Sequence, residues 1–139
     1  MGNNEMKQTF LSIQSCVSYG HVGNSAVTFP LQRLGVEVWP IHTVLFSNHT
    51  GYGKWRGSII DVQTVREVFL GIKERNLLPL CDALISGYMG SIELGQVMID
   101  AVTELRSIRP YTVYCCDPVM GDVGRGFFVQ KGIPEFLKK

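Results

Sequence analysis

The stretch TFLSIQ (residues 9–14), together with the helical pattern that follows it and the run VEVWPI (residues 36–41), decides the fold class. Alternating apolar positions with β-branched and aromatic residues predict a strand over 9–14. Small and polar residues then indicate a loop as far as Gly23. Apolar residues recur at helical spacing over 24–34, and 36–41 alternates like a second strand. The opening third of the chain is therefore predicted to be a β-α-β unit.

The predicted helix over 24–34 has recognisable signals at both ends. Asn24 or Ser25 can serve as its N-cap, and Gly35 is typical of a helix stop. Pro30 lies inside the pattern, where its missing N–H and its ring disfavour a regular helix. The helix is therefore expected either to begin later than residue 24 or to be kinked at Pro30.

The rest of the chain repeats the alternation of strand and helix. A helical pattern follows Asp61 as N-cap, a buried strand is predicted at 82–86, and a second amphipathic helix opens at Ser91 and ends before Pro110. Another strand is predicted at 111–116. The order β-α-β-α-β-α-β predicts an α/β, doubly wound, mainly parallel sheet with helices on both faces.

Composition limits the classes of function. The chain has 139 residues, 45% of them hydrophobic, which suits one domain with a real core. Its 13 basic and 12 acidic residues give a net charge of +1, so nucleic acid and anionic membranes are not expected partners. No apolar run reaches the ~18 residues of a membrane span.

A cytoplasmic location is expected from two features of the sequence. Residues 1–6 lack the charged start and apolar stretch of a secretory signal. The four cysteines, Cys16, Cys81, Cys115 and Cys116, contain no C-x-x-C unit, so reduced and mostly buried thiols are expected.

Polar and aromatic residues gather where the predicted strands end. In parallel sheets, ligands bind beyond the carboxyl ends of the strands, and Ser15, Tyr88, Asp117 and the segment 43–55 all follow such ends. The run FSNHTGYGKW (residues 46–55) mixes ring faces with hydrogen-bonding groups. It predicts a site for a flat ligand with polar substituents. The alternative is a surface loop whose aromatic rings fold back on the core.

Two carboxylates follow the last predicted strand. Asp117 and Asp122 flank a turn and could hold a divalent cation near nucleotide phosphates. Alternatively, Asp117 caps the turn and Asp122 is simply solvated. No Walker loop or G-x-G-x-x-G segment occurs in the chain, so its glycines alone are weak evidence for a phosphate site. No G-x-S-x-G elbow occurs either, so hydrolase chemistry is not supported.

Taken together, these segments resemble the pyridoxal kinase family of the ribokinase-like superfamily. The segments that carry the resemblance are SIQS (12–15), GHVGN (20–24), FPLQRLG (29–35), FSNHTGYGKW (46–55), SGY (86–88) and CDPVMG (116–121). The resemblance implies transfer of the ATP γ-phosphoryl group to the 5′-hydroxyl of pyridoxal, pyridoxine or pyridoxamine. A pyridine ring suits the flat ligand expected from the residues.

The resemblance also implies roles for individual residues. Positions that match contacts to the vitamin are Ser15, Phe46, His49, Thr50, Gly51 and Tyr88. It implies that Asp117 lies in the ATP site and that Asp117 and Asp122 hold Mg²⁺, with a monovalent cation as a further candidate. Trp55 would belong to the segment that covers the substrate, and full-length members are expected to form homodimers.

The chain departs from the family in length. Members are about twice as long, and the Gly-x-Gly-Asp segment with the catalytic base falls in the half that has no counterpart here. The chain is therefore expected to be the N-terminal part (1–139) of a single kinase domain with an incomplete C-terminal half. It should contain no catalytic residue and be inactive alone. The alternatives are a noncatalytic vitamer-binding fragment and a hydroxymethylpyrimidine-type kinase; residues 46–55 favour a B6 vitamer over the latter ligand.

Overall fold

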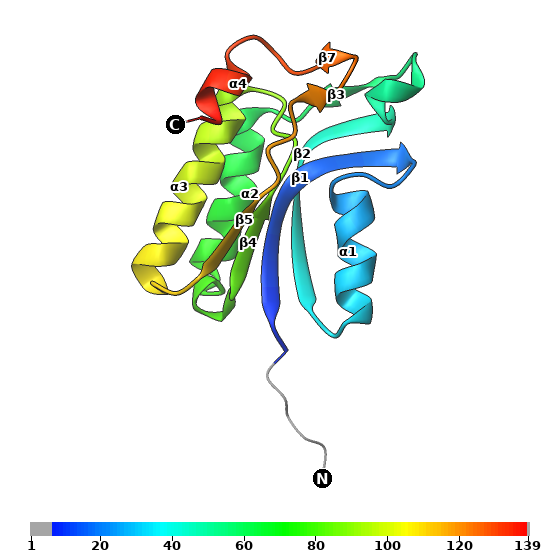
Figure 1. Ribbon diagram of the computed structural model, residues 1–139. Coiled ribbons are helices and arrows are strands. Elements are labelled where there is room, and N and C mark those ends of the chain that lie inside the picture. Colours follow the sequence, from blue (N-terminus) through cyan, green and yellow to red (C-terminus); the bar gives the residue numbers. More distant parts are fainter. Residues whose placement is uncertain (1–6, 139) are drawn as a thin grey trace.

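The computed structural model describes residues 7–138; residues 1–6, which bear on the secretory-signal expectation, and residue 139 lie outside the described part. A five-stranded sheet runs through the molecule in the order β3-β2-β1-β4-β5 (Figure 1). Its strands are β1 (Thr9–Tyr19), β2 (Glu37–Asn48), β3 (Gly57–Ile59), β4 (Ala83–Ser86) and β5 (Val113–Cys116). All neighbouring pairs are parallel except β2 with β3.

Helices cover both faces of this sheet, as the alternation of patterns predicts. The helix α1 (Asn24–Arg33) packs on β1 and β2, whereas α2 (Val62–Glu74) and α3 (Ile92–Ile108) lie side by side on the opposite face (Figure 1). The predicted α/β class, with a mainly parallel sheet between helices, is confirmed.

The main hydrophobic core lies between the sheet and the pair α2 and α3. Leu11 and Ile13 of β1 and Leu84 of β4 are fully buried there against Leu94 and Leu105 of α3. Because successive side chains of a strand point to opposite faces, Ser12 and Gln14 of β1 point toward α1 instead. The α1 side of the sheet therefore carries buried polar groups where the other side carries apolar ones.

Two of the predicted helix starts are confirmed by their capping bonds. Asp61 Oδ2 accepts a hydrogen bond from the Thr64 amide at 3.1 Å, and Ser91 Oγ accepts one from the Leu94 amide at 3.2 Å. Each bond satisfies an amide that has no partner within the first helical turn.

The predicted N-cap of α1 is wrong. Gly23 occupies the cap position, and neither Asn24 nor Ser25 caps the helix with its side chain. Both side chains are bound to strands: Asn24 bonds to β1 and β2, and Ser25 bonds to Val17. Pro30 lies inside the helix, which begins at Asn24 and not later.

Strand β1 is longer than predicted, so the expected loop from Ser15 to Gly23 is mostly wrong. β4 pairs with β1 only as far as Ile13, yet β1 continues to Tyr19 beside β2. The Ser25 hydroxyl donates to the Val17 carbonyl at 2.8 Å and accepts from its amide at 3.2 Å. A helix side chain thus satisfies backbone groups that would otherwise lack a strand partner.

Strand β2 also extends beyond its predicted end and takes in half of the expected loop 43–55. Residues 44–46 pair with the short antiparallel strand β3, which the sequence patterns do not indicate. The 3-10 helix η1 (Thr50–Tyr52) lies within the remaining part of this loop. Further along the chain come η2 (Leu78–Leu80), the two-stranded ribbon β6 (Gly121–Asp122) and β7 (Gly126–Phe127), and α4 (Ile133–Phe136).

The cysteines are free, but only in part buried. Cys81 is buried, Cys16 is half-buried, and Cys115 and Cys116 are exposed on the edge strand β5. The expectation of mostly buried thiols is therefore wrong for this pair. None of the helices within residues 7–138 has the length and apolar character needed to cross a membrane.

Candidate functional site

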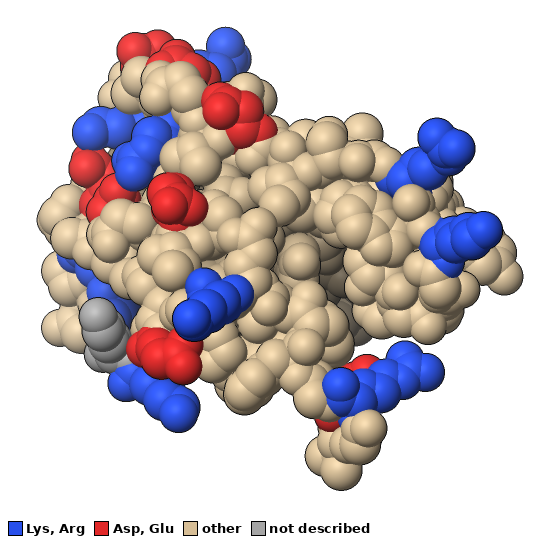
Figure 2. Space-filling model, turned by 90° about the horizontal axis from the view of Figure 1, so that it is seen from above, with Lys and Arg blue, Asp and Glu red and all other residues tan. Residues whose placement is uncertain are grey.

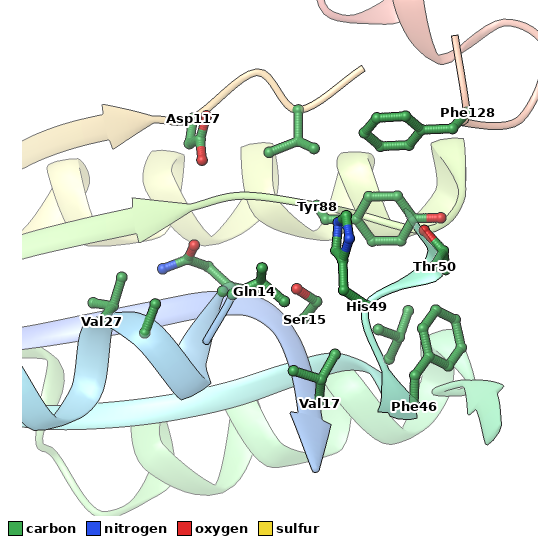
Figure 3. A pocket seen from close by; sticks show the side chains of 15 residues that line it. Gln14, Ser15, Val17, Val27, Phe46, His49, Thr50, Tyr88, Asp117 and Phe128 are labelled. Carbon is green, nitrogen blue, oxygen red and sulfur yellow. The ribbon is translucent and has the colours of Figure 1, made fainter. Parts of the chain in front are cut away.

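A pocket of about 320 Å³ opens at the carboxyl ends of the parallel strands, where the predicted site residues were expected to meet. A hollow is visible on this face, bordered mostly by uncharged residues, while charged side chains lie around the periphery (Figure 2). Its size is within the range of small-molecule sites. The pocket is lined by Gln14, Ser15, Val17, Val22, Gly23, Ala26, Val27, Val44, Phe46, His49, Thr50, Tyr88, Asp117, Val119 and Phe128 (Figure 3).

Ser15 lies at an irregularity in the pairing of the two central strands. Gln14 pairs with His42 and Cys16 with Leu45, so β2 contains one residue more than β1 across this interval. Such bulges redirect side chains and are frequent next to binding sites. Ser15 is only 7% exposed and lines the pocket wall.

Phe46 forms an aromatic wall of the pocket, and Trp55 packs against it. Phe46 is 5% exposed, and its ring centroid lies 4.3 Å from that of Trp55. Trp55 is 44% exposed and does not line the pocket itself. The two aromatic residues of this segment therefore have different positions. Phe46 faces the pocket, and Trp55 packs on Phe46 outside it.

His49 and Thr50 reach the pocket from the loop after β2 (Figure 3). Phe128, which follows β7, lies beside His49. His49 Nδ1 accepts a hydrogen bond from the Gly51 amide at 3.2 Å. In the neutral ring this leaves the proton on Nε2, which is free to donate. Gly51 does not line the pocket, but a side chain there would meet the His49 ring and come within 3.2 Å of Arg125 Nη1.

Tyr88 and Asp117 bring the ends of β4 and β5 to the same pocket (Figure 3). Burial raises the pKa of Tyr88, so its phenol stays protonated at neutral pH. The Thr43 hydroxyl donates to the Tyr88 carbonyl at 2.6 Å and fixes the chain there. Asp122 does not line the pocket; its carboxylate lies 4.0 Å from Arg125 on the β6–β7 ribbon.

A buried polar network supports the pocket from the α1 side. Asn24 Nδ2 lies 3.0 Å from the Ile41 carbonyl and 3.0 Å from His42 Nδ1, and Asn24 Oδ1 accepts from the Ser12 hydroxyl at 2.7 Å. Gln14 Nε2 donates to the same Ser12 oxygen at 2.9 Å. The network joins α1 to both central strands immediately behind the pocket.

Protonation of His42 should weaken the folded state. Burial lowers the pKa of His42 below its ordinary value of 6.5, and a protonated Nδ1 could no longer accept from Asn24. The unfolded chain binds this proton more readily, so the free energy of unfolding should fall as the pH drops through 6.5 and level off below the folded pKa. Urea unfolding between about pH 5 and pH 8 measures this dependence. A His42→Gln variant should show a smaller slope, and an equal slope would contradict the assignment.

The structure brings together most, but not all, of the residues predicted for the site. Ser15, Phe46, His49, Thr50, Tyr88 and Asp117 line one pocket, whereas Gly51 and Asp122 do not. Sequence patterns missed Gln14 and Phe128. Gln14 carried a signal, because a polar residue in a buried strand needs a hydrogen-bond partner. Phe128 carried none, since only tertiary folding brings it beside His49.

Comparison with known proteins agrees with the fold. The pyridoxal kinase PdxY of Rubrobacter xylanophilus is 60% identical over 129 residues, which are 93% of this chain and 44% of that protein. The pyridoxal kinase of Leishmania donovani in complex with ADP and pyridoxamine superposes with a TM-score of 0.87 at 35% identity, over 94% of this chain and 47% of that one. The chain is homologous to part of the pyridoxal kinases.

Other pyridoxal kinase structures give the same agreement. The enzyme of Entamoeba histolytica with PLP matches with a TM-score of 0.88 at 25% identity, over 96% of this chain and 48% of that one. The chain spans less than half the length of each of these pyridoxal kinases. No family model matches the sequence.

Proposed function

We propose that residues 1–139 are the N-terminal part of a single ribokinase-like domain and form the vitamer site of a B6 kinase. The reaction is transfer of the ATP γ-phosphoryl group to the 5′-hydroxyl of pyridoxal, pyridoxine or pyridoxamine. The observation that carries the proposal is the convergence of Ser15, Phe46, Thr50 and Tyr88 on one pocket. The homology to pyridoxal kinases over nearly the whole chain supports it.

The pocket suits a substituted pyridine. Phe46 and nearby valines supply apolar walls for the ring, and Ser15, His49 and Thr50 supply hydrogen-bonding groups for its substituents. Gly51 contributes by leaving room for the His49 ring and Arg125. The exposed indole of Trp55 packs against Phe46, and we assign it to the segment over the substrate.

ATP and Mg²⁺ are assigned to the side of the pocket that carries Asp117. Mg²⁺ bound to a nucleotide needs only one or two carboxylates, because phosphates and water supply its other ligands. Asp117 fits this requirement, being exposed at the pocket wall. Asp122 fits it less well, because it lies outside the pocket near Arg125, so we assign it a water-mediated role. Bound Mg²⁺ would neutralise charge on the transferred phosphoryl group.

The remaining parts of the proposal concern the intact enzyme. We propose that the enzyme is cytoplasmic and that it forms a homodimer when full length. A monovalent cation is a further candidate cofactor. Residues 7–138 contain no cluster of three or more His, Cys, Asp or Glu side chains suited to a metal ion.

Titration with pyridoxal tests the vitamer site. The fluorescence of Trp55 should change on binding, because its ring contacts the pocket residue Phe46; a Trp39→Phe variant removes the only other indole. Loss of one neutral hydrogen bond in Ser15→Ala should weaken binding about three- to tenfold. Ser18→Ala, an exposed position on the same strand, is the matched control. Saturable binding that Ser15→Ala leaves unchanged would remove Ser15 from the site.

A further inference from the structure

Gln14 is a buried polar residue at the pocket to which the residue patterns assign no role. It is 3% exposed and lines the pocket next to Ser15 (Figure 3). Buried amides usually satisfy both their oxygen and their nitrogen with hydrogen bonds. The Gln14 nitrogen has a partner in Ser12, whereas its oxygen accepts no hydrogen bond from the described residues.

The orientation of the Gln14 amide is determined by a chain of hydrogen bonds that starts at the backbone. Asn24 Nδ2 lies 3.0 Å from the carbonyl oxygen of Ile41 and 3.3 Å from that of Gln14. Carbonyl oxygens only accept, so the Asn24 amide must turn its NH₂ group toward them. Asn24 Oδ1 then accepts the single proton of the Ser12 hydroxyl at 2.7 Å.

The same logic continues from Ser12 to Gln14. With its proton given to Asn24, the Ser12 oxygen can only accept, and the group 2.9 Å from it must be the NH₂ of Gln14. Gln14 Oε1 is thereby turned away from the network. It lies against Gly87, where a Cβ atom would come within 2.5 Å of it. Gly87 has no side chain to displace this oxygen from the pocket wall.

We infer that Gln14 Oε1 is a pre-oriented acceptor that binds a hydroxyl donor of the ligand. The inference rests on the proposed B6-vitamer site, and it adds a specificity residue to that site. The acceptor is uncharged and held in place before the ligand arrives, so little conformational entropy is lost on binding. An amide free to flip could offer either its donor or its acceptor; this one offers only its acceptor.

Hydroxyl deletion in the ligand, combined with mutation of Gln14, tests the inference. The unaltered chain and Gln14→Met would be titrated with pyridoxine and with three analogues that each lack one of its hydroxyl groups. Gln14→Met keeps the length of the side chain and removes the acceptor. The substitution should weaken the binding of pyridoxine about three- to tenfold. It should not change the affinity for the one analogue that lacks the hydroxyl bonded to Gln14. Gln32→Met, exposed on α1, is the matched control.

A second variant tests the orientation through Ser12. Ser12 is fully buried and does not line the pocket, so Ser12→Ala can affect the ligand only through its neighbours. Without the Ser12 hydroxyl the Gln14 amide can flip. The variant should therefore lose affinity for the same ligands as Gln14→Met, namely those that keep the hydroxyl bonded to Gln14. Ser18→Ala is its control, and circular dichroism checks that each variant is folded.

The outcomes separate this inference from the proposed function. If Gln14→Met weakens pyridoxine and all three analogues by the same factor, or weakens none, Gln14 does not accept from the ligand and the inference is overturned. If the unaltered chain binds no vitamer in the titration, the proposed site fails and the inference fails with it. The inference is supported if both variants lose affinity only for the ligands that keep the hydroxyl bonded to Gln14.

Discussion

Purified 139-residue chain supplied with pyridoxal, ATP and Mg²⁺ is expected to form no measurable pyridoxal phosphate. The chain contains no Gly-x-Gly-Asp segment, which the resemblance to pyridoxal kinases makes the source of the catalytic base. A positioned general base is worth roughly 10²- to 10⁴-fold in rate, and loss of phosphate positioning reduces the rate further. Product formation can be followed by absorbance or chromatography.

The pyridoxal kinase PdxY of Rubrobacter xylanophilus, assayed at the same concentration, is a suitable positive control because it is 60% identical over the shared part. Binding of pyridoxal should be measured in the same samples, so that an inactive chain can be distinguished from a misfolded one. Steady ATP-dependent formation of pyridoxal phosphate by the 139-residue chain would show that its own residues suffice for catalysis.

Gly23→Ala is expected to have the largest effect of any single substitution at the site. Gly23 has φ 52° and ψ −131°, a conformation that residues with a side chain rarely adopt. An added Cβ would also overlap the carbonyl oxygen and the hydroxyl of Ser15. We expect a loss of roughly 2–4 kcal/mol in the free energy of unfolding and loss of pyridoxal binding through displacement of Ser15. Urea unfolding and the Trp55 titration measure the two effects.

Gly35→Ala provides the matched comparison. Gly35 also has a positive φ, of 85°, but no atom lies within 4 Å of an added Cβ. Backbone strain alone should cost about 1 kcal/mol there and leave binding intact. Equal destabilisation by the two substitutions would mean that the contact between Gly23 and Ser15 contributes nothing beyond backbone strain.

Local patterns predicted the fold class correctly because the strands and helices that build it have strong periodicity. The helices after Asp61 and Ser91 begin where their capping side chains indicate. The buried strand at 82–86 was equally clear, since it is short, apolar and followed by glycine. The strand-end rule then located most of the site, because the carboxyl ends of parallel strands meet at one edge of the sheet.

Boundaries were predicted less well wherever a distant partner completes an element. β1 continues past Gln14 because β2 pairs with it and Ser25 satisfies the backbone of Val17, which no local pattern reveals. Similarly, Asn24 looks like a helix cap in sequence, but its amide bonds to two strands. In both cases a nonlocal hydrogen bond outweighs the local preference of the residue.

The sequence by itself determined the class of fold, the edge of the sheet at which the pocket opens and the resemblance to B6 kinases, because these depend on periodicity and on contiguous motifs. Only the tertiary structure decided which motif residues share a pocket. It placed Phe46 inside and Trp55 outside, separated Asp117 from Asp122, and bound the nitrogen of Gln14 to Ser12. The physical reason is that side-chain direction depends on a strand bulge and on hydrogen bonds between segments far apart in the chain.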